Sequence, residues 1–167
     1  MDTLKYRTGL KRIWAAVVDW IVFMPLLLIG KWIYKSTDNL SLLSAWATFI
    51  VFAPYFYSVI LHFKYGQTIG KWVVGVKVID ISEARQLTMW QSLYRDGLFL
   101  LLAALGLLYY IVLLVSSKDA NASITDYYQL AEQLMFYWTL LELVTMLTNT
   151  KRRGLNDLIA RSIVVRT

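Results

Sequence analysis

The sequence predicts an all-α integral membrane protein, a four-helix transmembrane bundle with both termini in the cytoplasm. Three observations predict this class. First, 58% of the 167 residues are hydrophobic and the mean hydropathy is +0.52, so the chain carries more apolar surface than one domain can bury. Second, four apolar runs are long enough to cross a bilayer. Third, the basic residues cluster beside these runs instead of spreading along the chain.

A single membrane domain, residues 1–167, is predicted to contain all four spans. They cover residues 13–32, 40–63, 97–115 and 128–147. The first span follows a basic stretch that resembles the start of a secretory signal, but no small-residue cleavage site ends it, so we expect the span to be retained. Pro25 lies in the first span and Pro54 in the second. Each proline is expected to kink or loosen its helix.

The segment 64–96, between the second and third spans, is predicted to lie on the cytoplasmic membrane surface. Gly66–Lys71 can open a short interfacial helix, and residues 87–95 carry apolar side chains at helical spacing for a second one. Val74–Ile79 has the alternation of a short strand and can pair with Ser162–Val165. We therefore expect a small cytoplasmic strand pair next to the bundle.

The basic residues predict the orientation of the chain. Fourteen of the seventeen fall at the N-terminus, in the 64–96 segment or in the C-terminal segment 151–167. Lys31, Lys35 and Lys118 are left for the opposite side. By the positive-inside rule the three basic segments are cytoplasmic, and an even number of spans allows this for all of them.

Three acidic residues lie inside apolar runs, Asp19 in the first span and Glu132 and Glu142 in the fourth. Glu132 falls close to the outer surface, so we expect no functional role for it. An aspartate at the centre of a spanning helix costs about 2.5–3.5 kcal/mol, so Asp19 needs a partner, a proton or a water-filled cavity. Arg12 is roughly 10 Å away along the same helix, which makes a pair within that helix strained. The sequence leaves two readings open. Asp19 and Glu142 can share a cavity and couple an ion to a proton, or an arginine such as Arg12, Arg95 or Arg153 can simply pair with the acid.

Enzymatic chemistry is not expected from this sequence. The chain has no cysteine and one histidine, and it lacks a phosphate loop and the motifs of serine hydrolases and zinc proteases. We therefore expect no catalytic residues, no cofactor and no metal site. His62, at the end of the second span, is expected to be an interfacial residue. The basic residues flank spans and do not alternate with exposed aromatics, so binding of nucleic acid is not expected.

Several groups of residues, in order along nearly the whole chain, resemble the motifs of one family. They are Arg12-x-x-Ala15-x-x-x-Asp19, Gly66–Lys71 followed by Gly75–Asp80, Leu87-Thr88 with Gln91–Leu93 and Arg95, and Arg153 with Asp157 before Val164-Val165. The chain thereby resembles the RDD family, which is named after an arginine and two aspartates. By position, these are Arg12, Asp19 and Asp157.

Three positions depart from the family pattern. The family often has a histidine before the second aspartate, where this chain has Asn156. It often has Gly-Thr before the terminal valines, where this chain has Arg161-Ser162. The glycine that usually follows the first strand is absent, and Glu83-Ala84 stands in the turn. A proton step that depends on a histidine beside Asp157 is therefore not expected here.

The resemblance implies a protein of the bacterial cytoplasmic membrane and two functions. RDD proteins include some that look like sodium(lithium, potassium)/proton antiporters and others that look like membrane parts of larger assemblies. The first hypothesis is a carrier that exchanges protons for a monovalent cation, with Asp19 as the cation site, Glu142 as its auxiliary and Arg12–Asp157 as a charge pair on the cytoplasmic side. Since four spans form few walls, this carrier is expected to be a homo-oligomer.

The alternative hypothesis is a non-transporting scaffold or assembly subunit, in which the charges lock a cytoplasmic cap onto the helices. A third hypothesis is the binding of a lipid or another hydrophobic ligand at the surface of residues 72–95. The expected partners are therefore membrane lipids, a monovalent cation and a proton, and further protein subunits.

Overall fold

Four long helices form the framework of the computed structural model, which describes residues 3–37, 39–116 and 120–167. They are α1 (Gly9–Ser36), α2 (Leu40–Tyr65), α4 (Met89–Ser116) and α5 (Ala120–Thr148). Five short elements accompany them: η1 (Thr3–Tyr6), α3 (Ile69–Val73), β1 (Val76–Asp80), α6 (Leu155–Ile159) and β2 (Ser162–Arg166). The described chain is thus mostly helical, with one two-stranded sheet.

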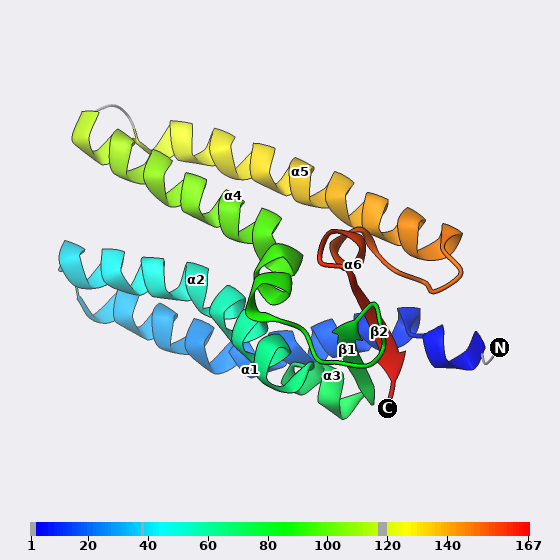
Figure 1. Cartoon of the computed structure of the whole chain (residues 1–167). Coiled ribbons are helices and arrows are strands. Elements are labelled where there is room, and N and C mark those ends of the chain that lie inside the picture. The colour runs from blue at the N-terminus through cyan, green and yellow to red at the C-terminus, as the bar shows by residue number, and fades with distance from the viewer. Residues whose placement is uncertain (1–2, 38, 117–119) are drawn as a thin grey trace.

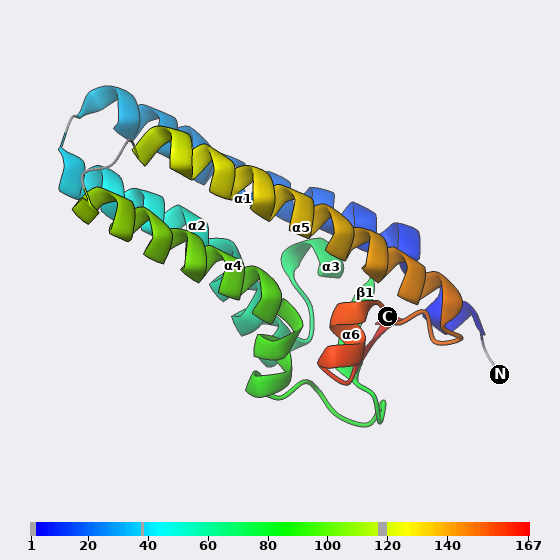
Figure 2. The same ribbon diagram turned by 90° about the horizontal axis from the view of Figure 1, so that it is seen from above.

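The long helices run as two pairs, α1 beside α2 and α4 beside α5 (Figure 1). The pairs meet mainly through α2 and α4, and α1 also packs against α3. Both termini lie at one end of the bundle, and the short elements α3, β1, α6 and β2 gather there as well (Figures 1 and 2). We call these four short elements the cap. The last turn of α1 and the first turn of α2 lie at the opposite end (Figure 1).

Three helices among the described residues are long and apolar enough to cross a membrane: Leu4–Ser36, Ser41–Tyr65 and Met89–Tyr109. Their large apolar side chains are mostly exposed, Trp14, Leu28 and Phe56 among them, as expected for surfaces that face lipid. These helices agree with the first three predicted spans. The fourth predicted span, residues 128–147, falls in α5. This helix is as long as the other long helices, but it is not one of the three that meet the length and hydropathy criteria for a membrane span.

Among the described residues, the cluster of buried apolar side chains lies at the cap. β1 and β2 pair antiparallel, with Val78 opposite Val164, so the predicted strand pair is confirmed. Val76, Leu87 and these two valines are each at most 3% exposed and pack into one cluster. A small, close-packed cap is therefore attached to one end of long helices whose outer faces are apolar.

The third long helix differs from the prediction at its start. It begins at Met89 and not near residue 97, so the amphipathic helix predicted over 87–95 is the first part of α4. Thr88 caps this start, because its hydroxyl oxygen accepts a hydrogen bond from the Gln91 amide at 3.2 Å. No proline interrupts the sequence that follows. The amphipathic turns and the apolar span therefore form one helix, which bends near its start (Figure 1).

Candidate functional site

Asp157 is the third residue of α6, and its side chain is fully buried. One carboxylate oxygen lies 2.6 Å from Nη1 of Arg12 on α1, and the other lies 2.7 Å from Nη1 of Arg95 on α4. A single carboxylate therefore pairs with two guanidinium groups from two long helices. The Arg12–Asp157 pair expected from the sequence is present, and Arg95 is a second partner. We call Arg12, Arg95 and Asp157 the Asp157 junction.

Neutral donors complete the surroundings of this carboxylate. The Gly154 amide donates to it at 3.1 Å, and the Ser162 hydroxyl donates at 3.4 Å. Burial alone would raise the pKa of Asp157, but the charges of Arg95 and Arg12 outweigh burial and hold the pKa below its ordinary value. Asp157 is therefore ionised at neutral pH and binds α6 to both long helices.

Arg153 stabilises the cap itself. Its guanidinium donates to the carbonyl oxygen of Ser162 at 3.0 Å and to that of Asp157 at 3.1 Å. These two bonds tie the loop before α6 to the start of β2 and to α6 itself. Arg153 is thus a supporting charge of the cap, with no contact to Asp19.

Glu142 of α5 also contacts the cap. Its carboxylate accepts a hydrogen bond from the Asn156 side-chain amide at 3.1 Å, and the Asn156 oxygen accepts one from the Trp138 indole, also at 3.1 Å. Gly154 permits this approach, since a Cβ there would lie 2.7 Å from a Glu142 carboxylate oxygen. Asn156, which replaces the histidine common in the family, thus connects α5 to α6.

Asp19 of α1 is bound by three donors, none of them charged. Tyr57 on α2 donates its hydroxyl at 2.7 Å, the Thr68 hydroxyl donates at 2.6 Å and the Gly70 amide at 2.8 Å. An arginine was one of the two alternatives that the sequence left open for Asp19. In the described part of the chain Arg12, Arg95 and Arg153 bind other groups. Among the described residues, the hydrogen bonds of Asp19 and of Glu142 go to different groups.

Close packing of α3 on α1 makes the Asp19 contacts possible. Thr68 is the N-cap of α3, and its hydroxyl oxygen accepts from the Lys71 amide while the hydroxyl donates to Asp19. A Cβ at Gly70 would collide with the carbonyl oxygen of Ala15 and lie 2.8 Å from the Asp19 carboxyl carbon. Gly70 is therefore required where the two helices touch.

His62 belongs to a buried polar group that the sequence reading missed. It is 1% exposed, and its ring nitrogens lie 3.1 Å from the Ser58 hydroxyl and 2.8 Å from the Lys71 ammonium. Ser58 in turn donates to Asp96 on α4 at 2.7 Å. The sequence held one signal for this group, since Ser58 and His62 are four residues apart on one helix and share a face. The contacts with Lys71 and Asp96 arise only from folding.

Two of the departures from the family pattern coincide with strained backbone. Glu83 and Arg161 both have positive φ, 61° and 48°, where glycine is the least strained residue. Glu83 is compensated by contacts, because Lys151, Lys5 and Tyr6 all donate to its carboxylate. The hydrogen bonds from Lys151 and then Lys5 lower its pKa to about 2.

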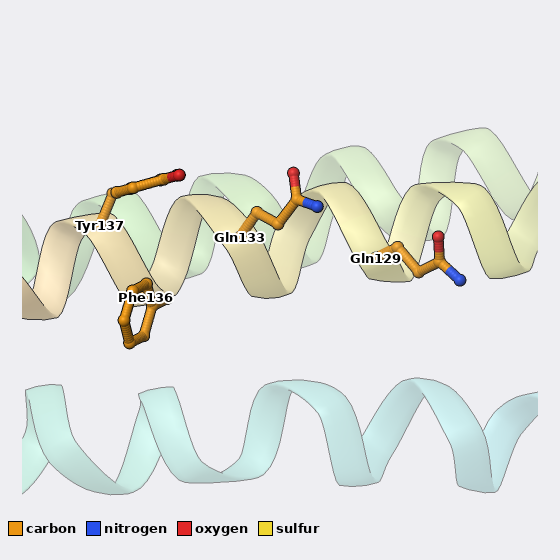
Figure 3. A pocket seen from close by; sticks show the side chains of 4 residues that line it. All are labelled: Gln129, Gln133, Phe136 and Tyr137. Carbon is orange, nitrogen blue, oxygen red and sulfur yellow. The ribbon is translucent and has the colours of Figure 1, made fainter.

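A pocket of about 310 Å³ lies on α5, away from these groups. It is lined by Gln129, Gln133, Phe136 and Tyr137, and Figure 3 shows Phe136 and Tyr137 pointing to different sides of the helix. None of the acids or arginines discussed above lines it. Among the described residues, no three histidine or acidic side chains gather in a way that could hold a metal ion.

Comparison with known proteins gives two matches. Residues 6–161 match the model of the RDD family. The chain is also similar to a Bacillus subtilis (strain 168) protein described as uncharacterized membrane protein YteJ. The two are 29% identical over 116 residues, which cover 65% of this chain and 70% of that protein. No solved structure matches the chain.

Proposed function

The chain belongs to the RDD family, and we propose that it is a membrane scaffold: its helices anchor a rigid cap that a partner subunit binds. The observation that carries this proposal is the Asp157 junction. A buried carboxylate pairs with two arginines from α1 and α4, and the resulting network ties the cap to the helices. Such a network resists movement, because losing either partner leaves a buried charge unpaired.

We propose four spans, α5 being the fourth, with the cap and both termini in the cytoplasm of a bacterium. The position of the termini at one end of the bundle supports this topology (Figure 1). The concentration of basic residues in the terminal segments and in the 64–96 segment also supports it. The similarity to a B. subtilis membrane protein supports the choice of membrane. The proposal includes no enzymatic activity and no nucleic-acid partner.

The surroundings of Asp19 also favour a scaffold over a carrier. A cation site needs oxygen atoms that face the ion with free lone pairs. Asp19 is instead surrounded by donors, the Tyr57 and Thr68 hydroxyls and the Gly70 amide. These donors occupy three of the roughly four lone-pair sites of the carboxylate, so a cation that needs more than one carboxylate lone pair would have to displace a donor. In the scaffold, the same three bonds serve to hold α2 and α3 against α1.

We propose that α5 contacts α5 of a second copy of the chain. Gln129 and Gln133 are exposed, four residues apart and therefore on one face of α5. A primary amide both donates and accepts, so two such faces can satisfy each other within lipid. We expect Gln129→Leu combined with Gln133→Leu to reduce dimer formation in a cross-linking assay in membranes. Gln86→Leu, the same change in an exposed loop, should leave it unchanged; an unaffected dimer in the double variant would contradict this contact.

Exchange of protons for a monovalent cation is the second candidate. It is favoured by the two carboxylates carried on long helices, Asp19 on α1 and Glu142 on α5. In this reading Asp19 titrates with the cation and Glu142 assists it. Proton and cation flux in proteoliposomes, together with the melting temperature in detergent, distinguishes the two functions.

For the scaffold, we expect flux no greater than in empty liposomes and an Asp19→Asn variant that melts several degrees lower than the parent. For the carrier, the parent would exchange sodium or potassium for protons, and Asp19→Asn would remove the exchange without lowering the melting temperature. That second result would overturn the scaffold proposal.

A further inference from the structure

The polar group around His62 is separate from the Asp157 junction and shares none of its residues. It runs from Lys71 on α3, through His62 and Ser58 on α2, to Asp96 on α4. The successive heavy-atom distances are 2.8, 3.1 and 2.7 Å, all within hydrogen-bonding range. The group therefore connects a cation to an anion through two neutral side chains, in a place where His62 is shielded from water.

The chemistry of the four groups fixes the direction of each hydrogen bond. A lysine ammonium can only donate, so Nε2 of His62 accepts and the ring proton lies on Nδ1. The Nδ1–H group donates a hydrogen bond to the Ser58 oxygen, and the Ser58 hydroxyl donates a hydrogen bond to the Asp96 carboxylate. All donors thus point from Lys71 towards Asp96. Such an aligned chain is what proton transfer over several bonds requires.

We propose that Lys71, His62, Ser58 and Asp96 form a proton relay, in which Lys71 passes a proton to Asp96. Three protons shift one place each. The Lys71 N–H bond breaks as an N–H bond forms at Nε2 of His62, and the Nδ1 proton moves to Ser58. The former hydroxyl proton of Ser58 moves to Asp96. Lys71 and Asp96 become neutral, His62 changes tautomer, and no atom enters or leaves the group.

The charged groups around Lys71 favour release of its proton. Burial lowers the pKa of Lys71 to about 8, and the positive charge of Arg95 acts in the same direction. Asp96 and Asp19 oppose this effect, and Arg12 adds a smaller lowering. The ammonium is thus only weakly favoured near neutral pH, so its neutral form is within reach.

The relay goes beyond the scaffold function and does not depend on it. Lys71, Ser58 and Asp96 belong to three different elements, so the transfer would neutralise two charges where α2, α3 and α4 meet. The transfer would remove one positive and one negative charge from the contact between these three helices, and every hydrogen bond of the group would be kept. Transport across the membrane is not part of this inference.

The tautomer of His62 tests the relay, and the chain's single histidine makes the measurement direct. In protein labelled with ¹⁵N-histidine and reconstituted in lipid, every imidazole signal belongs to His62. We expect a neutral ring at pH 7, mainly protonated at Nδ1, in exchange with a minor form protonated at Nε2. Ser58→Ala cuts the relay and should remove the minor form.

The matched control is Ser92→Ala. Ser92 is also a buried serine, and its hydroxyl has no hydrogen-bond partner within the described part of the chain. This variant should give the spectrum of the parent. Asp96→Asn removes the final acceptor and should abolish the exchange as Ser58→Ala does, which provides a second test if Ser58→Ala does not fold. A charged imidazole at pH 7, or one fixed tautomer in the parent, would overturn the relay.

Discussion

The two aspartates of the family motif, Asp157 and Asp19, are both satisfied, but by groups of different kinds. Asp157 is fully buried between two arginines. Asp19 is partly buried, and only hydroxyl and amide groups bind it. Loss of one partner from a buried ion pair leaves the other charge buried and unpaired, which strongly lowers the free energy of unfolding. Loss of one neutral donor out of three lowers it only moderately. We therefore expect the cap to depend steeply on Asp157 and gradually on Asp19.

The largest effect should come from Asp157→Asn. Removing the negative charge leaves Arg12 and Arg95 without a counter-ion, so we expect a loss of about 3–5 kcal/mol in the free energy of unfolding. Denaturant or thermal unfolding in detergent measures this loss. The control is Glu83→Gln, because Glu83 pairs with the more exposed Lys5 and Lys151 and such surface pairs contribute about 0–1 kcal/mol. Equal losses in the two variants would break the comparison.

Tyr57→Phe tests the Asp19 side of the comparison. The variant removes one of three donors to Asp19 and an acceptor for the Ile69 amide. We expect a loss of about 1–2 kcal/mol, clearly smaller than that of Asp157→Asn. Tyr34→Phe on the same framework changes an exposed tyrosine of α1 and should have no effect. If Tyr57→Phe proved as costly as Asp157→Asn, Asp19 would be no less critical than Asp157.

The pH dependence of stability should reveal Lys71, on which the charges of Asp96 and Asp19 act. Its pKa falls from 10.5 to about 8 on folding, so between these values the unfolded chain binds more protons than the folded one. The free energy of unfolding should then rise as pH increases from 8 to 10.5. Thermal unfolding of the parent should show this rise relative to Lys71→Met. Lys64→Met, at an exposed position, should behave like the parent; a flat difference for Lys71→Met would contradict the shift.

The smallest expected effect has the opposite sign. Arg161 is exposed and has a φ of 48°, so its side chain adds strain to the turn before β2. Arg161→Gly should remove this strain and stabilise the protein by up to about 1 kcal/mol, seen as a higher melting temperature. Arg85→Gly is not used as the control, because this change would also remove the ion pair between Arg85 and Asp80. A lower melting temperature for Arg161→Gly would show that its side chain matters more than its backbone.

Sequence reasoning succeeded where the signal is local or carried by a motif. Hydropathy predicted three of the long apolar helices, alternation predicted that β1 pairs with β2, and the family motif predicted the Arg12–Asp157 pair. It failed for the partners of Asp19. Thr68 and Gly70 belong to the Gly66–Lys71 motif, which does not reveal their partner, and Tyr57 belongs to no motif. Only the packing of α2 and α3 against α1 brings the three donors to one carboxylate.

The same limit explains why His62 was missed. A lone histidine at the end of a span is normally interfacial, and only the fold places Lys71 and Asp96 around it. The missing glycines at positions 83 and 161 were visible in the sequence. Their consequence is that Glu83 and Arg161 adopt a positive φ, and this could be recognised only from the backbone angles of the folded chain.

Rigid attachment of the cap to the helices is the central claim, and a distance distribution between two spin labels tests it most directly. The chain has no cysteine, so one cysteine at exposed Leu10 on α1 and one at exposed Ile159 on α6 can be labelled cleanly. We predict a narrow distribution for the otherwise unchanged chain in lipid and a broad one when Asp157→Asn is added. A distribution that is equally narrow with and without Asp157→Asn would contradict the claim that the Asp157 junction holds the cap in place.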